Sequence, residues 1–242
     1  MKRNRKIIVS LLLTVVLLVG IGCALYLSDY YHADDMAMET MAQSSEQVKK
    51  YQDGSILFFV PKEPVAGMIF YPGGKVQCEA YAPLMQACAE RGILCALVRM
   101  PGNLAVFNPN AAEGIQKKHP EITSWYMGGH SLGGAMAASY VSKHVEEYDG
   151  LILLAAYSTS DISESPLHVL SIYGSEDGVL NKDKYERSKS NLPDDFEESV
   201  IDGGCHAYFG SYGPQDGDGT PTISNEEQVV QTADIIRNAV TK

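Results

Sequence analysis

Cysteine is scarce in this sequence of 242 residues, which contains only five. They have neither the paired spacing of zinc ligands nor the density of a small disulfide-bonded domain. Cys23 lies in an apolar N-terminal segment, and the others are Cys78, Cys88, Cys95 and Cys205. Neither a cysteine metal site nor a disulfide framework is therefore expected to define the fold, and whether any of the four pair stays open.

Basic residues are also few, with 19 lysines and arginines against 30 aspartates and glutamates. Four of the basic residues precede residue 7, so the rest of the chain carries 15 basic against 30 acidic groups. Because such a negative surface repels polyanions, we expect no nucleic acid partner. The sequence also lacks internal repeats and low-complexity linkers, and its length suits a single α/β domain.

Charge is absent from Ile7 to Leu27, a run of 21 residues. As a helix rising about 1.5 Å per residue, this run is long enough to cross the roughly 30 Å hydrocarbon layer of a membrane. The basic cluster before it and the aspartates after it predict a single span at residues 7–27. The positive-inside bias then predicts a cytoplasmic N-terminus and a domain outside the cell membrane.

Two alternatives to a membrane anchor stay open. Gly22 and Ala24 form a small-x-small pattern that a signal peptidase cuts, which would give a secreted protein. The sequence around Cys23 matches a lipid-attachment site poorly; lipid attachment there would give a lipid-anchored protein. We therefore expect a signal anchor at residues 1–28, a helical juxtamembrane segment at 29–46 and the folded domain at 47–242.

Apolar runs alternate with helical patterns along the domain. An Asp53-Gly54 turn predicts an N-terminal hairpin, and further strands are expected at 67–71, 93–100, 123–127, 150–157, 168–173 and 198–201. Helices are expected at 33–42, 80–91, 111–118, 133–144, 182–190 and 226–239, the last with a capping box of Ser224 and Glu227. This alternation predicts an α/β fold with a mostly parallel sheet, helices on both faces and an antiparallel hairpin at its start.

The sharpest motif is Gly129-His130-Ser131-Leu132-Gly133, between an expected strand and an expected helix. This Gly-x-Ser-x-Gly pattern is typical of a strained turn that exposes a serine hydroxyl, and the glycines remove side chains that would collide. The alternative is a purely structural role, in which the motif is a glycine-rich helix start capped by serine. The context favours Ser131 as a nucleophile.

A serine nucleophile needs a base, because its hydroxyl reacts poorly at neutral pH. His206 follows the final strand, where a loop would place it over the sheet edge, whereas the other five histidines are less well placed. Asp177, after the strand ending at Tyr173, is favoured as the acid that orients the imidazole, with Glu176 and Asp161 as alternatives.

Backbone N–H groups must also stabilise the oxyanion of an acyl-transfer reaction. The first expected donor is the N–H of Leu132, directly after the nucleophile. The second should come from Pro72-Gly73-Gly74-Lys75, after an expected strand. We predict the N–H of Gly74, with that of Lys75 as the alternative.

In these motifs the chain resembles the α/β-hydrolase superfamily, and within it the small cap-less bacterial hydrolases related to dienelactone hydrolases and carboxylesterases. The resemblance covers about residues 47–239 and rests on the segments 71–76, 128–134, 173–179 and 212–219. It implies a carboxylesterase-type serine hydrolase acting on a small ester or thioester substrate, with the order nucleophile, acid, base at Ser131, Asp177 and His206. Dienelactone hydrolases use a cysteine where this chain has Ser131, so their substrate is not carried over.

The remaining expectations concern the surroundings of the site. The short connection between residues 157 and 168 leaves no room for a helical lid, and the glycine-rich segment 209–225 is expected to cover part of the pocket. Asp216 and Asp218 lack the other ligands of a calcium loop, so neither a metal nor a cofactor is expected. A catalytically silent binding domain and an acyltransferase remain alternative functions, and the oligomeric state is open.

Overall fold

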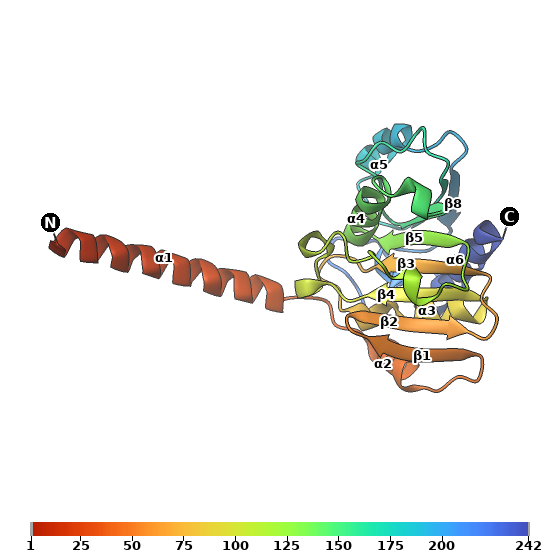
Figure 1. Ribbon diagram of the computed structural model, residues 1–242, viewed down its shortest axis with the longest axis horizontal. Helices are drawn as coiled ribbons and strands as arrows, with labels where there is room; N and C mark the ends of the chain where they lie inside the picture. Colours follow the sequence, from red (N-terminus) through yellow and green to blue (C-terminus); the bar gives the residue numbers. More distant parts are fainter. Residues whose placement is uncertain (1, 242) are drawn as a thin grey trace. The chain divides into compact units, whose positions relative to one another are not determined.

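The structure is a computed structural model that describes residues 2–241 and divides after Tyr30 into two units. The N-terminal unit contains one long helix, α1 (Lys2–Ser28) (Figure 1). Its window Leu11–Ser28 has a mean hydropathy of 2.5 and no buried residues, so it is long and apolar enough to cross a membrane. A signal sequence near the N-terminus has the same length and apolar composition, so the helix fits both a membrane anchor and a cleaved signal.

The C-terminal unit is built on one eight-stranded sheet in the order β1-β2-β4-β3-β5-β6-β7-β8 (Figure 1). The strands from β3 onward pair in parallel, and β1 and β2 form the expected antiparallel hairpin, with β2 antiparallel to β4. The strands are β1 (Val48–Asp53), β2 (Ile56–Pro61), β3 (Ala66–Tyr71), β4 (Ile93–Val98), β5 (Trp125–His130), β6 (Gly150–Leu154), β7 (His168–Gly174) and β8 (Glu197–Ile201).

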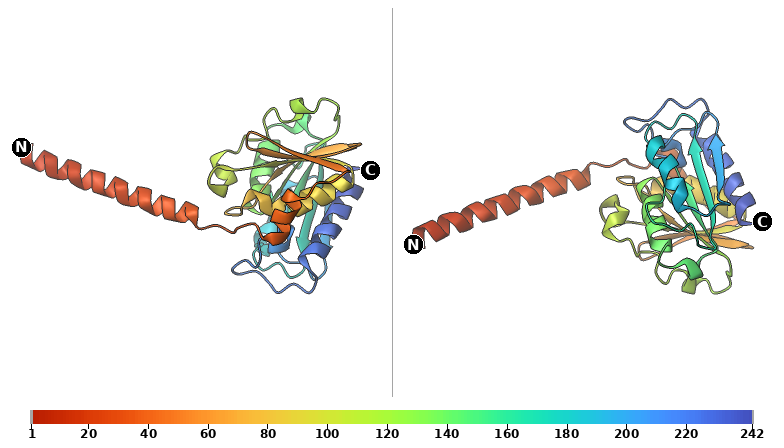
Figure 2. Two further views of the ribbon diagram at one scale, coloured as in Figure 1. Left: turned by 90° about the horizontal axis from the view of Figure 1, so that it is seen from below. Right: turned by 90° about the horizontal axis from the view of Figure 1, so that it is seen from above.

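Helices cover both faces of this sheet (Figure 2). The α-helices of this unit are α2 (Asp35–Ala42), α3 (Ala82–Glu90), α4 (Leu132–Val141), α5 (Lys182–Ser188) and α6 (Asn225–Val240). Helices α3 and α6 lie on one face, and α4 and α5 lie on the other. The architecture is therefore the predicted α/β fold with a central, mostly parallel sheet.

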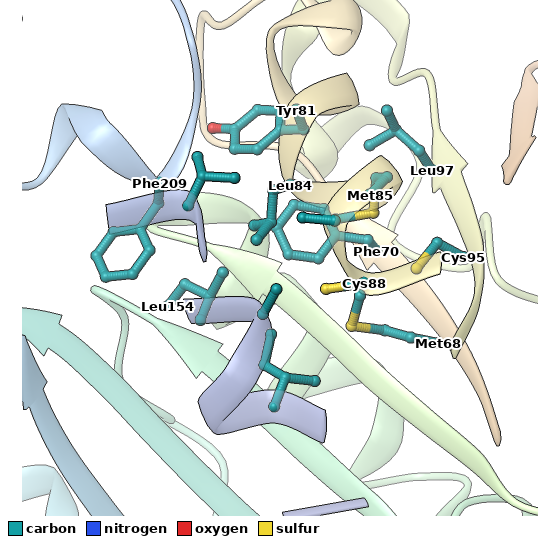
Figure 3. Close-up of a cluster of buried hydrophobic side chains, with 14 of the residues drawn as sticks. Met68, Phe70, Tyr81, Leu84, Met85, Cys88, Cys95, Leu97, Leu154 and Phe209 are labelled. Atoms are coloured by element: carbon teal, nitrogen blue, oxygen red, sulfur yellow. The ribbon is translucent and has the colours of Figure 1, made fainter. Parts of the chain in front are cut away.

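Alternation along the buried strands divides the core between the two faces. In β3, Met68 and Phe70 belong to the cluster under α3 and α6, whereas Ile69 and Tyr71 belong to the cluster under α4. Successive side chains of a strand point to opposite faces, so a fully apolar strand fills both layers. Figure 3 shows the first cluster, in which Met68 and Phe70 lie against Leu84 and Met85 of α3 and against Cys88 and Cys95.

Most of the predicted elements are present, including the two with specific end signals. Gly54 has a positive φ of 59° in the hairpin turn, and Ser224 and Glu227 form the complete capping box of α6. The helix expected at 111–118 is wrong: this segment forms turns and one short 3₁₀ helix, Gln116–Lys118. Gly114 has a positive φ of 75°, and the Tyr71 hydroxyl bonds the backbone of Pro109 and Ala112, which together favour turns over a helix.

The parallel strands end level with one another along one edge of the sheet. Tyr71 pairs with Gly129, His130 with Leu154, and Gly174 with Ile201. Loops that follow β3, β5, β6, β7 and β8 therefore start at the same edge, where ligands bind in open α/β sheets.

Helix α4 starts in close contact with the loop after β3. A Cβ atom on Gly133 would overlap the carbonyl oxygens of Tyr71 and Pro72. Backbone atoms cannot move aside as a flexible side chain can, so the start of α4 depends on glycine at this position.

We predict that Gly133→Ala lowers the free energy of unfolding by about 3 kcal/mol or more, because it forces α4 away from the sheet. Urea denaturation of the purified chain in detergent measures this change. The matched control is Ser139→Ala, a half-buried position on the same helix, which should stay within about 1 kcal/mol of wild type. Equal stability of the two variants would contradict this packing constraint.

Candidate active site

Ser131 occupies the single position between β5 and α4, with φ 51° and ψ −122°. Residues with a Cβ rarely adopt this conformation, which costs on the order of 1–3 kcal/mol and persists only where the surrounding fold imposes it. A Cβ atom on Gly129 would lie 2.6 Å from the carbonyl carbon of Gly133, so the turn closes tightly around the serine. The strained strand-to-helix turn expected from the motif is present.

His206 and Asp177 form a buried pair at the same edge of the sheet. The Nδ1 atom of His206 lies 2.9 Å from Oδ2 of Asp177, and the two residues are 1% and 4% exposed. Oδ1 of Asp177 accepts the N–H groups of Val179 and Leu180 at 2.9 and 2.8 Å. Because a carboxylate accepts hydrogen bonds, Nδ1 of His206 is the donor in this pair. The Nε2 atom of His206 is buried and has no hydrogen-bond partner among the described residues.

Neither alternative acid lies in this pair. The exposed Asp161 carboxylate accepts the N–H and hydroxyl of Ser163. Glu176 is exposed and accepts the hydroxyl of Ser175. Asp177 is therefore the predicted acid that contacts the histidine.

The loop after β3 places three successive N–H groups differently. The N–H of Gly73 donates to the Tyr81 hydroxyl at 2.9 Å, and that of Lys75 donates to the Asn103 carbonyl at 2.8 Å. The N–H of Gly74, between them, meets no acceptor among the described residues. The Lys75 alternative is thus occupied, whereas Gly74 is available.

Gly74 and Leu132 lie against each other. A Cβ atom on Gly74 would be 2.8 Å from Cδ2 of Leu132, the first residue of α4. The N–H of a first helical residue has no acceptor inside the helix. The two N–H groups predicted as oxyanion donors therefore belong to segments in contact.

His130, one of the five histidines that were less well placed than His206 to act as the base, is fully buried beside His206. Their ring centroids are 4.5 Å apart, and Nδ1 of His130 lies 2.7 Å from the Tyr81 hydroxyl. Because the Tyr81 hydroxyl also accepts the N–H of Gly73, it joins His130 to the loop after β3. Burial, followed by the positive charge of a protonated His206, lowers the pKa of His130 well below its ordinary value. His130 is therefore neutral and connects the turn that carries Ser131 to the loop after β3.

Asp218 holds the acid and histidine loops together. Its Oδ1 accepts the N–H groups of Gly178 and His206 at 3.1 and 3.2 Å, and its Oδ2 accepts that of Ala207 at 2.8 Å. Burial opposes ionisation of Asp218, but these bonds outweigh it and lower the pKa of the carboxyl. The segment 209–225 was expected to cover part of the pocket, but none of the described residues that line the pocket belongs to it. It contacts the site through the bonds of Asp218 to the two loops.

The sequence contains one signal for this contact between the two loops. Asp218 stands between two glycines, and Asp177 precedes Gly178. A Cβ atom on Gly178 would lie 2.6 Å from the carbonyl oxygen of Gly217. Paired glycine-rich loops of this kind indicate close backbone approach.

Ser131 and His206 line one cavity of about 320 Å³. Its other walls come from α4 and from the loops after β6 and β7. Apart from His206, the lining contains no titratable acid or base except the Tyr157 phenol. The remaining lining residues are Leu132, Ala135, Met136, Ala155, Ala156, Tyr157, Thr159, Val179, Leu180 and Asn181.

The cysteines are poor alternatives to Ser131 as nucleophiles. Cys205 precedes His206, but burial raises the pKa of its thiol to about 12, and burial raises the pKa of Cys78 equally, to about 12. The thiolate is the reactive form, so both are inert at neutral pH. Within residues 2–241, no disulfide forms.

The part of the chain that the structure describes contains no group of three or more His, Cys, Asp or Glu side chains arranged to hold a metal ion. The chemistry available at the site is that of the serine, the histidine–carboxylate pair and the backbone N–H groups.

Comparison with known proteins agrees with this fold. Residues 67–230 match the profile of a family described as the alpha/beta hydrolase family, which is more than half of the chain. No curated protein sequence is significantly similar to the chain.

Solved structures share the fold at low sequence identity. A predicted CIB-like hydrolase from Thermoplasma acidophilum has a TM-score of 0.56 at 16% identity, covering 79% of this chain and 98% of that one. Est1E from Butyrivibrio proteoclasticus has a TM-score of 0.59 at 14% identity, covering 81% and 100%. Est1E with bound ferulic acid has a TM-score of 0.60 at 14% identity, covering 82% and 98%.

The depressed pKa of His130 predicts a pH-dependent loss of stability. Below about pH 6.5 the unfolded chain binds a proton at His130 that the folded chain cannot bind, so stability falls as pH falls. We expect the stability difference between wild type and His130→Gln to shift against wild type between pH 7.5 and pH 5. Urea denaturation at both pH values measures it, and parallel profiles would contradict a neutral, buried His130.

Proposed function

The chain belongs to the α/β hydrolase family, and we propose that it is a carboxylesterase-type serine hydrolase that cleaves an ester or thioester through an acyl-enzyme on Ser131. The observation that carries this proposal is the state of His206. Its Nδ1 is held by Asp177, its buried Nε2 has no partner in the described structure, and the residue lines the same cavity as Ser131. A general base needs a ring nitrogen that no other group engages.

In the proposed first step, Oγ of Ser131 attacks the carbonyl carbon while Nε2 of His206 takes the hydroxyl proton. The negative charge that develops on the carbonyl oxygen is stabilised by the N–H groups of Gly74 and Leu132. The imidazolium formed on His206 is stabilised by Asp177. As the tetrahedral intermediate collapses, His206 returns its proton to the departing alkoxide or thiolate, which leaves as an alcohol or thiol.

In the second step, water replaces the leaving group. Nε2 of His206 takes a proton from the water as its oxygen attacks the acyl-enzyme, and the same N–H groups stabilise the second oxyanion. Collapse releases a carboxylic acid and returns the proton to Oγ of Ser131. The reaction requires no cofactor or metal.

His130 and Asp218 support this reaction without touching the reacting atoms. A second positive charge beside His206 would oppose its protonation during catalysis, and neutral His130 avoids that repulsion. Asp218 fixes the backbone of His206 and Ala207, so the ring is held from its main chain as well as from Asp177.

We propose that residues 7–27 anchor the protein in the cell membrane with the N-terminus in the cytoplasm and the hydrolase domain outside. Cleavage near Ala24 or lipid attachment at Cys23 would instead give a secreted or lipid-anchored domain. Intact mass spectrometry of the protein from membranes and from the medium distinguishes these products.

We predict that Ser131→Ala lowers kcat/KM for a simple ester by about 10⁴-fold or more, because no other nucleophile replaces the serine. Wild type should also be labelled covalently by a fluorophosphonate, and Ser131→Ala and His206→Ala should not. Ser142→Ala, at the other end of α4, is the matched control and should label like wild type. A folded wild type that neither labels nor turns over esters would favour a silent binding domain.

The acyltransferase alternative uses the same acyl-enzyme with an alcohol or amine in place of water. Adding such acceptors to the ester assay, and measuring acylated product against free acid, separates it from a hydrolase.

We predict that Asp218→Asn lowers kcat/KM about 10- to 100-fold. The asparagine amide has one accepting oxygen where the carboxylate has two, so it leaves a backbone N–H without an acceptor at a cost of about 1–3 kcal/mol. Asp216→Asn, an exposed position in the same loop, is the control and should keep wild-type kcat/KM. Equal kcat/KM in the two variants would contradict a role of Asp218 in holding His206.

A further inference from the structure

The folded domain starts beside the loop that carries Gly74. The N–H of Tyr31 donates to the carbonyl of Lys75 at 2.7 Å, and the carbonyl of Tyr31 accepts the N–H of Gln77 at 2.9 Å. Tyr31 and Val76 form a parallel bridge. The first residue of the domain is thus fixed immediately next to Gly74, the proposed oxyanion donor.

The connection from the apolar helix to this attachment point is short. Helix α1 ends at Ser28, and Tyr31 follows three residues later. Three residues of extended chain span at most about 10 Å. This limit follows from chain length alone and holds for every orientation of the helix. The headgroup layer of a bilayer is about 5–7 Å thick on each side.

Exposed apolar side chains lie near Tyr31 and Gly74, on the surface that these residues, Lys75 and the segment 103–107 form, which we call the rim. Asn103, which accepts the N–H of Lys75, begins the segment 103–107, and Leu104 lies against Gly74. Val106 and Phe107 in this segment are 46% and 57% exposed. Within the described residues of the domain, they are the one pair of consecutive large apolar side chains that are both exposed.

We propose that this rim lies against the bilayer surface, with Val106 and Phe107 in the membrane interface. We also propose that the substrate is an amphiphilic ester held in the leaflet that faces the domain. The proposal rests on the proposed function and on the anchor at residues 7–27. Aromatic and aliphatic side chains partition favourably into the interface. The cavity beside Ser131 has apolar walls, which suit an uncharged acyl chain.

The first experiment uses the full chain in phosphatidylcholine nanodiscs with two esters of one leaving group. 4-Methylumbelliferyl acetate reports hydrolysis from water, and 4-methylumbelliferyl oleate reports hydrolysis from the bilayer. The variant carries 20 Gly and Ser residues inserted between Ser28 and Asp29, which spans about 25 Å on average. It leaves the site untouched and only lengthens the connection.

We expect acetate turnover to be unchanged and oleate turnover to fall about tenfold, because the effective concentration of site and bilayer ester falls. Unchanged oleate turnover, or acetate turnover by wild type without any oleate turnover, would overturn the proposal while leaving the proposed hydrolase intact. Absence of both activities and of fluorophosphonate labelling would instead reject the hydrolase.

A second readout does not depend on activity. Phe107→Trp in nanodiscs with brominated lipid should lose tryptophan fluorescence beyond the wild-type background of Trp125. Val65→Trp is the matched control, since Val65 is 48% exposed but precedes β3, at the opposite edge of the sheet from Gly74. Quenching of Val65→Trp equal to that of Phe107→Trp would overturn the proposed orientation. Absence of quenching of Phe107→Trp would also overturn it, as expected if the rim binds a protein partner in place of lipid.

Discussion

The close approach of α4 to the edge of the sheet is the constraint on which the rest of the site depends. Glycines at 129 and 133 let backbone pass backbone where any side chain would collide. The same approach holds Ser131 at φ 51° and brings Leu132 against Gly74. The backbone strain at Ser131 is thus maintained by the packing of several residues, and one geometry positions both the proposed nucleophile and the proposed oxyanion donors.

Two carboxylates, buried Asp177 and half-buried Asp218, divide the task of holding His206. Asp177 holds the ring and is itself held by two backbone N–H groups, whereas Asp218 holds the backbone on either side of the histidine. A buried carboxylate such as that of Asp177 is costly without such partners. Asp177 accepts from its own loop and from His206, whereas Asp218 accepts from Gly178 after β7 and from His206 and Ala207 after β8, so the two loops are tied to each other.

The predictable parts of the molecule are those with local signals. Gly-x-Ser-x-Gly, the Asp53-Gly54 turn and the capping box of α6 each need only a few neighbouring residues, and the alternation of strands and helices gives the sheet. The Tyr81–His130 link joins segments far apart in the chain, and no local pattern reports it. For the bonds of Asp218 the only local sign is the glycines beside Asp177 and Asp218, which indicate a close approach but not its partners. The segment 111–118 shows the converse error, because a helical pattern there gives way to turns around the buried Tyr71 hydroxyl.

Val179 and Leu180 serve the site twice, through different atoms. Their backbone N–H groups hold Asp177, and both residues also line the cavity. An exchange of side chain at either position reshapes the cavity and leaves the N–H groups in place. Proline is the exception, because it has no N–H to donate. Related sequences are therefore free to diverge in pocket shape at these two positions, without proline, while the setting of the acid stays the same.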